Sequence, residues 1–203
     1  MNTEHIKLAF GILSIIPAAI AYTLYFKGLF SGKIKPHAFS WLIWGLLAGN
    51  GFIAQMSAQA GIGAWATGIT SMACLTIFGV ALFKGSARLG TLDWFLLGLA
   101  LLSFGLLFVI EDKTIALCIT LFATLLGFSM TLRKAWQKPQ EEAALAFALN
   151  GIKFLPAIFA LAHYSFLTVA YPLTAGLANG AVVAVVLLRA RQTSVAKNMY
   201  DSV

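Results

Sequence analysis

The sequence predicts an all-α integral membrane protein with seven spanning helices in a single transmembrane domain, residues 1–203. The composition indicates this class, because 60% of the residues are hydrophobic and 10% are charged, whereas soluble domains carry about a quarter charged residues. The apolar residues also form long blocks rather than the narrow stripe of a surface helix. At ~1.5 Å per residue, each block is long enough to cross a hydrocarbon core of ~30 Å.

Seven such blocks follow one another with short connections, so no soluble domain of any size is expected. The first block, which contains Ala18-Ala19-Ile20-Ala21, also resembles a secretory signal. We interpret it as a helix, because its removal would leave an even helix count that conflicts with the charge pattern. The predicted spans are residues 7–27, 38–58, 61–83, 91–110, 114–134, 142–163 and 166–188.

Basic residues lie mostly on one side of the membrane in this arrangement. Eleven fall on the side that holds the C-terminus, and two, Lys7 and Lys113, fall on the other. Because short loops rich in Lys and Arg stay cytoplasmic, the N-terminus is expected outside and the tail, residues 189–203, in the cytoplasm. The net charge of +7 then reflects this asymmetry rather than a nucleic-acid surface. The eleven are Lys27, Lys33, Lys35, Lys84, Arg88, Arg133, Lys134, Lys138, Arg189, Arg191 and Lys197.

Prolines at the start of two predicted helices indicate an internal repeat. Pro36 precedes the second helix and Pro139 the sixth, positions at which the missing N–H of proline is well tolerated. The offset of 103 residues (139 minus 36) carries Asn50 of the second helix onto Lys153 of the sixth. The chain then divides into two parallel three-helix repeats and a linker helix, with a substrate site expected between the repeats. These parts are residues 7–83, 114–188 and 91–110, respectively.

Lys153 lies in the middle of an apolar segment, Leu149-Asn150-Gly151-Ile152-Lys153-Phe154-Leu155-Pro156, and is the first candidate for function. An ionisable side chain at membrane depth is costly, and every acidic residue falls at a helix end or in a loop. Lys153 is then either a neutral amine, because burial disfavours its charged form, or an ammonium that forms an ion pair with an anionic ligand. We expect a pocket for a small organic anion or a polar solute that carries a carboxylate.

Four further polar residues complete the predicted substrate-binding site. Lys153 and Asn50 lie ~16 Å and ~20 Å from the cytoplasmic ends of their helices, and Asn179 and Thr70 lie ~18 Å and ~12 Å from the outer ends. Asn150 shares a helical face with Lys153, because the two are three residues apart. As alternatives, Asn50 and Asn179 join helices by hydrogen bonds, and Thr70 bonds back to its own helix.

Four residues are gate or hinge candidates. Trp41 and Trp44 lie on one helical face nearer the cytoplasm, where they can line a gate. Pro17 and Pro172 lie inside predicted helices, where proline removes a backbone hydrogen bond. The alternative for both prolines is a static kink with no moving part.

Several motifs along the chain match one known pattern of membrane transporters. They are Pro17 in the first helix, Phe39-Ser40-Trp41-Leu42 followed by Asn50, the pair Pro139-Gln140, and Pro172 with Gly176 and Gly180. Together they resemble the SWEET sugar transporters and the wider PQ-loop superfamily. The resemblance implies three helices, a linker helix and three more, with the N-terminus outside and Pro17 as a hinge.

The chain departs from that family at its sugar-contacting positions. Leu173 stands where the family has an asparagine after the proline of the seventh helix, and Trp65 stands near the counterpart in the third. Ala54 and Phe159 align near the tryptophans expected late in the second and sixth helices. The resemblance therefore implies the fold and solute transport, while the pocket chemistry differs from that of a sugar site.

The predicted function is a transporter (facilitator) of a small polar or anionic solute, working by alternating access in a bacterial inner (plasma) membrane. The alternative is a non-transporting receptor, scaffold or assembly factor of the PQ-loop type. The expected partners are the solute and the lipid bilayer, with a homo-oligomer left open and no nucleic acid, metal or cofactor. An enzyme is not expected, because one lysine, scattered asparagines and the isolated Cys74 and Cys118 form no catalytic or metal set. A retinal photoprotein would need an intramembrane carboxylate to pair with Lys153.

Overall fold

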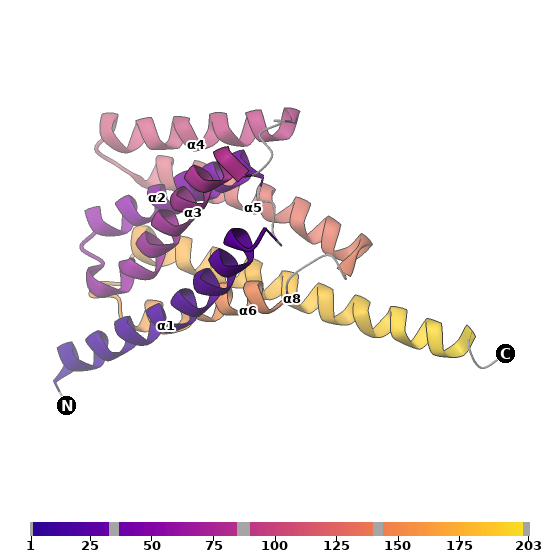
Figure 1. The fold of residues 1–203 in the computed structure, drawn as a ribbon. Coiled ribbons are helices and arrows are strands. Elements are labelled where there is room, and N and C mark those ends of the chain that lie inside the picture. The colour runs from indigo at the N-terminus through magenta and orange to yellow at the C-terminus, as the bar shows by residue number, and fades with distance from the viewer. Residues whose placement is uncertain (1, 33–36, 85–89, 140–143, 201–203) are drawn as a thin grey trace.

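The computed structural model describes residues 2–32, 37–84, 90–139 and 144–200, and its regular elements are helices (Figure 1). In chain order they are α1 (Thr3–Phe30), α2 (Ala38–Ser57), the 3₁₀ helix η1 (Gly61–Ala64), α3 (Trp65–Lys84), α4 (Thr91–Val109), α5 (Thr114–Gln137), α6 (Ala144–Ile152), α7 (Phe154–Phe159) and α8 (Phe166–Tyr200). Some residues used in the sequence analysis lie outside these ranges. They are Lys33, Lys35, Pro36, Arg88 and Gln140.

Length and composition make this a helical integral membrane protein. Five helical segments are long and apolar enough to cross a membrane, and residues Ala144–Phe159 form a shorter apolar helix. One face of α1 carries large apolar side chains at intervals of four residues, and each of them is about half exposed. This contiguous apolar surface is unusual for a soluble protein and suits contact with lipid. The side chains are Leu8, Ile12, Ile16, Ile20 and Leu24.

The helix boundaries differ from the prediction in two places. The last helix, predicted over 166–188, continues to Tyr200 and takes in most of the predicted tail. The sixth helix, predicted over 142–163, is described from Ala144 and ends at Phe159. It consists of α6 and α7, which join at Lys153, and the backbone of Lys153 keeps helical angles.

Pro156 explains why the helical hydrogen bonding is weakened around Lys153. Proline has no N–H, so the carbonyl of Ile152, four residues earlier, loses its helical partner and also meets the proline ring. The helical hydrogen bonds on either side are long, with 3.4 Å from Lys153 N to Leu149 O and 3.3 Å from Ala157 N to Lys153 O. The helical hydrogen bonding is therefore weakened at the buried Lys153, although its backbone keeps helical angles (φ −59°, ψ −28°).

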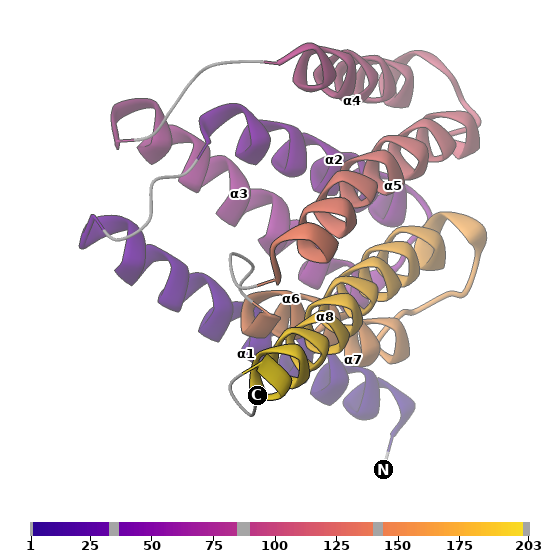
Figure 2. The same ribbon diagram turned by 90° about the vertical axis from the view of Figure 1, so that its right-hand side faces the viewer.

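The helices pack as two groups of three with α4 beside them. In the first triple, which is α1, α2 and α3, the helix α3 lies between α1 and α2 (Figure 2). In the second triple, which is α5, α6 with α7, and α8, the helix α8 lies between α5 and α6. The triples meet where α1 packs on α6 and α7 and where α2 packs on α5. Helix α4 covers α2 and α5 at the edge of the bundle.

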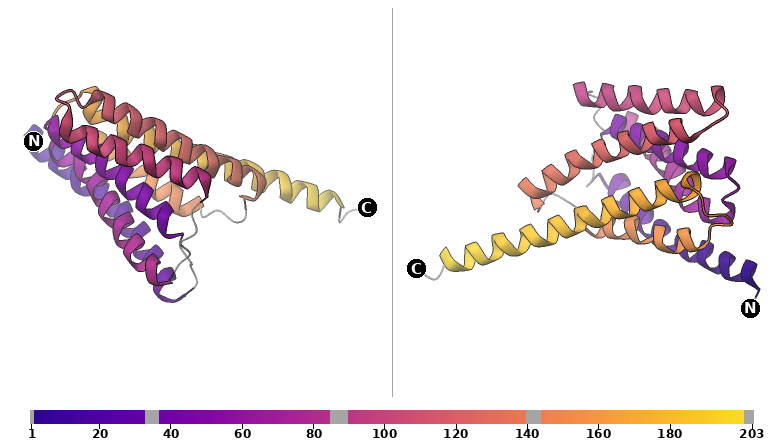
Figure 3. Two further views of the ribbon diagram at one scale, coloured as in Figure 1. Left: turned by 90° about the horizontal axis from the view of Figure 1, so that it is seen from above. Right: turned by 180° about the vertical axis from the view of Figure 1, so that it is seen from behind.

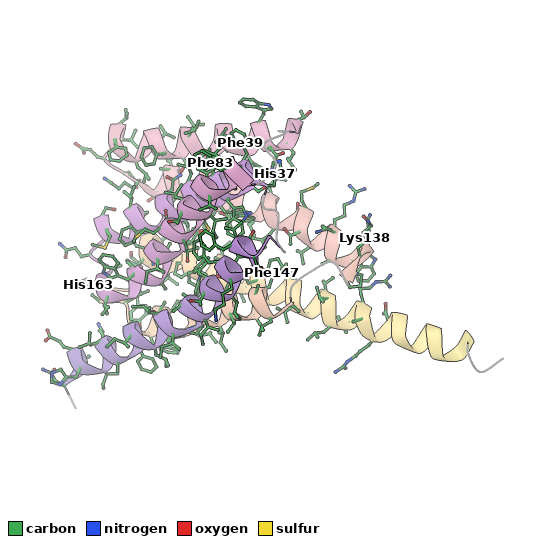
Figure 4. The ribbon with its side chains drawn as sticks, viewed as in Figure 1. His37, Phe39, Phe83, Lys138, Phe147 and His163 are labelled. Carbon is green, nitrogen blue, oxygen red and sulfur yellow. The ribbon has the colours of Figure 1, made fainter. Side chains whose placement is uncertain are left out.

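The two triples lie close together at one end of the bundle and separate towards the other (Figure 3). The close end, here called the N-terminal end, carries the start of α1, η1 and the turn that contains His163 (Figure 4). At the far end Lys138 marks the end of α5, and α8 extends beyond its neighbours (Figure 1).

Backbone contacts hold the N-terminal end together. Ala162 N donates to Ala60 O at 2.9 Å, and Lys7 Nζ donates to Ala162 O at 3.0 Å. Gly63 of η1 lies so close to α7 that a Cβ there would be 2.5 Å from Ala157 O and 2.8 Å from Leu161 N. Only glycine allows this approach, because the opposing atoms belong to the backbone.

A buried polar cluster joins α2, α4 and α5 and contains Asn50. The Asn50 amide nitrogen donates to Ala100 O and to Ser103 Oγ, both at 3.1 Å. Ser103 Oγ donates in turn to Ala116 O at 2.8 Å and contacts the hydroxyl of Thr120. Small hydroxyl side chains of this kind bind membrane helices together because lipid offers no competing partner.

Replacing Ser103 with alanine is expected to lower the free energy of unfolding by about 1–2 kcal/mol, because bonds to two neighbouring helices are lost. The measurement is SDS-induced unfolding of the purified protein in mixed micelles. Ser129→Ala is the matched control, since Ser129 is exposed and its hydroxyl bonds only to Leu126 O of its own helix. Equal unfolding curves for the two variants would contradict the expectation.

Candidate functional site

Lys153 is the only charged side chain buried among the residues that the structure describes, with 1% of its surface exposed. It lies where α6 joins α7, on the part of this helix that packs against the first triple. A buried cation needs partners that satisfy its N–H groups. The identity of those partners decides what the site can do.

Two neutral oxygens accept hydrogen bonds from the lysine. Lys153 Nζ donates to Asn150 Oδ1 at 2.7 Å, within the second triple. It also donates to Thr70 Oγ1 of α3 at 2.8 Å, across to the first triple. Three residues of the predicted substrate site, Lys153, Asn150 and Thr70, therefore lie together.

Aromatic rings complete the surroundings of the lysine. Nζ lies 5.3 Å from the ring centroid of Tyr22 in α1 and 5.1 Å from that of Phe154 in α7, within the range of cation–π attraction. The Phe154 ring in turn contacts Tyr171 of α8 edge to face, with centroids 6.5 Å apart. The sequence analysis did not identify these rings. The available signal was the polar tip of Tyr22 in the middle of a spanning helix, five residues after Pro17.

The site has an ionisable amine without an acidic partner among the described residues. Both hydrogen-bond acceptors are neutral, and the described acidic residues Glu4, Asp93, Glu111 and Asp112 lie at or beyond helix ends. An ammonium in this setting favours a ligand that brings one negative charge into the bundle. Because Lys153 is buried, a solute reaches Nζ only after the surrounding helices move apart.

The structure does not bring the two remaining predicted ligands to the lysine amine. Asn50 turns towards α4 and bonds there, where α2 packs against α4. Asn179 donates to Ala175 O of its own helix at 2.8 Å. A Cβ at Gly151 of α6 would lie 3.1 Å from the Asn179 Cβ, so the glycine is what lets α8 approach α6 at this point.

The two gate tryptophans occupy different positions. Trp41 packs on Tyr25 of α1, within the first triple, with ring centroids 4.7 Å apart. Trp44 instead crosses to Phe128 of α5 in the second triple, at 4.9 Å between centroids. Of the pair, Trp44 is the one that any separation of α2 from α5 would displace.

Pro17 and Pro172 lie inside α1 and α8 as predicted. The missing N–H of Pro172 frees the carbonyl of Thr168, four residues earlier. Gln55 of α2 supplies the replacement, because its Nε2 donates to Thr168 O at 2.8 Å. The carbonyl that Pro172 leaves without a helical partner therefore accepts a hydrogen bond from the other triple.

The structure also contains two pockets away from Lys153. A cavity of about 170 Å³ lies between α2, α4 and α5, where Ser40, Trp44 and Asp93 contribute to its wall. The second is a shallow groove on α5 and α8 near Tyr164 and Phe166. Neither includes Lys153 or its hydrogen-bond partners.

Within the described ranges, no group of three His, Cys, Asp or Glu side chains is placed to hold a metal ion. Cys74 is buried in α3, and Cys118 is exposed on α5. Comparison with protein families, curated proteins and solved structures finds no match to this chain.

Proposed function

We propose that this protein is a membrane transporter, a facilitator that moves a small polar or anionic solute by alternating access. It has seven spans, with the N-terminus outside and the C-terminus in the cytoplasm of a bacterial inner (plasma) membrane. The two triples rock against each other around Lys153. The fold is of the SWEET or PQ-loop kind, with α4 as the linker between parallel repeats.

The packing of the triples supports a repeat. In each triple the third helix lies between the first two. The contacts between the triples are also symmetric. The first helix of each triple packs on the second helix of the other: α1 packs on α6 with α7, and α5 packs on α2. Two parallel repeats related by an axis along the membrane normal have this pattern, and transporters with such repeats place their substrate between them.

The observation that carries the proposal is the buried lysine between the triples, on a helix that Pro156 deprives of one backbone hydrogen bond. Ionisable residues inside a membrane bundle are a frequent feature of substrate and ion pathways. Lys153 is such a residue and also bonds across the interface to Thr70. A bond between the moving parts can be exchanged for a bond to the solute.

The arrangement of the ends agrees with one state of such a cycle. The N-terminal end is closed by the contacts of Gly63 and of Ala60 with Ala162, whereas the triples diverge at the far end (Figure 3). In the proposed orientation this state is closed to the outside. The opposite state requires the contacts at Gly63 to open.

Solute counterflow in proteoliposomes tests the proposal. Vesicles that contain the purified protein are loaded with unlabelled pyruvate, gluconate or glucose and diluted into the labelled compound, with protein-free vesicles as the control. We expect transient accumulation of at least one carboxylate. If none of these solutes moves and a defined protein partner remains bound through purification, the receptor or scaffold function replaces transport.

A further inference from the structure

The hydrogen-bonding roles around Lys153 are set by bonds that its partners make elsewhere. The Asn150 Nδ2 group donates to Ala146 O at 3.0 Å, which leaves Oδ1 to face the lysine. The Thr70 hydroxyl donates its only hydrogen to Ala66 O at 2.7 Å, so its oxygen accepts from Nζ. Both partners are therefore acceptors only, and Nζ must supply two N–H groups.

Two N–H groups are available in either protonation state of lysine. A neutral amine has two hydrogens and an ammonium has three. The additional N–H of the ammonium can rest against the Tyr22 and Phe154 rings, whose faces attract a cation. The same side-chain arrangement thus accepts Lys153 with or without its proton.

The other titratable groups near the lysine do not compensate its charge. They are Tyr22 on α1, Cys74 on α3 and Tyr171 on α8, and all three are side chains that are neutral when protonated. Asn150 and Phe154, from α6 and α7, do not titrate. An ammonium in this position lacks a counter-charge until a ligand supplies one, so proton binding and anion binding favour each other.

We propose that the solute is a small monocarboxylate and that it crosses the membrane together with one proton carried on Lys153 Nζ. This inference rests on the proposed transport function and identifies its substrate class and coupling ion. On the side of entry, the amine takes a proton from water and the ammonium pairs with the carboxylate. On the other side both leave, and the amine returns neutral. No bond within the solute changes, and the net charge moved is zero.

The direct test is proton uptake on binding, measured by titration calorimetry in detergent in buffers of different ionisation enthalpy between pH 6 and pH 9. The probes are pyruvate and gluconate. For the wild type we expect protons to be taken up with the anion, approaching one per anion as the pH rises. Lys153→Arg, which carries a permanent charge, is expected to lose the uptake. Thr124→Val is the control, because the Thr124 hydroxyl bonds only to Thr120 O of its own helix.

Anion binding without proton uptake at every pH would overturn the coupling and leave the transporter in place. Binding of glucose but of neither carboxylate would overturn the substrate class. Vesicles provide a second readout that does not depend on any variant folding. A pyruvate gradient should acidify the lumen equally with and without an imposed membrane potential. Uptake that follows the potential and leaves the lumen pH unchanged would contradict the inference, whereas no movement of any solute would contradict the transport function itself.

Discussion

Replacing Lys153 with methionine is expected to abolish carboxylate binding while the protein remains folded. Methionine nearly matches the length of the lysine stem, and exchange of a buried charge for an apolar side chain of similar volume is often neutral or stabilising by about 1–4 kcal/mol. Against this, the Asn150 Oδ1 atom loses its donor, at a cost of about 1–3 kcal/mol. The two effects are of similar size, so the unfolding temperature should change little.

Binding should respond far more strongly than stability to this change. Removing one partner of a buried charged pair costs about 2–5 kcal/mol of binding free energy, which corresponds to a loss of roughly 30- to 5,000-fold in affinity. The measurement is a thermal-shift titration in detergent with pyruvate, gluconate and glucose. A ligand that binds the folded state stabilises it by about 2.7 kcal/mol at 100 times its dissociation constant, so the wild type should show a clear shift.

Thr124→Val is again the control, since the Thr124 hydroxyl is buried and bonds to Thr120 O of its own helix rather than to Lys153. A carboxylate shift that persists in Lys153→Met would show that the lysine has a structural role. A glucose shift of equal size in wild type and Lys153→Met would point to a neutral sugar as the solute. Retention of the carboxylate shift in Thr124→Val, with its loss in Lys153→Met, is the expected pattern.

The membrane class and the position of Lys153 inside the bundle could be predicted from sequence because both depend on the chemistry of single segments. A spanning helix must be apolar over its whole length, and a lysine without an acid is visible within such a segment. Asn150 followed from its spacing of three residues in the same helix. Thr70 was identified by depth alone, and the structure places it on the lysine.

The partners contributed by other helices could not be predicted in the same way. Asn50 lies on α2, which contacts α3, α4, α5 and α8, and depth does not decide which neighbour it faces. Tyr22 and Phe154 reach Lys153 through tertiary packing that no local pattern encodes. The weakened helical hydrogen bonding at Lys153 is different, because Pro156 indicates it directly through the carbonyl four residues earlier.

Gly63 is the second position at which a small change should have a large effect. A Cβ at this position would meet Ala157 O at 2.5 Å and Leu161 N at 2.8 Å, both backbone atoms of the second triple. They cannot turn aside as a side chain can, so Gly63→Ala should push η1 and α7 apart. Overpacking of this kind costs about 1–3 kcal/mol. If the cost falls only on the closed state, the ratio of closed to open protein drops by about 5- to 150-fold.

The expected result for Gly63→Ala is loss of transport with carboxylate binding retained. Opening of the N-terminal end is followed by an Ala60→Cys reporter in a Cys118→Ala background, using the rate of reaction with a membrane-impermeant maleimide. Ala60 is fully buried in the structure, so its replacement should react slowly until η1 and α7 separate. Gly79→Ala is the matched control, because a Cβ there meets nothing within 4 Å. If Gly63→Ala and Gly79→Ala react and transport alike, the contact between η1 and α7 is ordinary packing and the gate lies elsewhere. Faster labelling with intact binding and failed transport would instead mean that this end must close in every cycle, as alternating access around Lys153 requires.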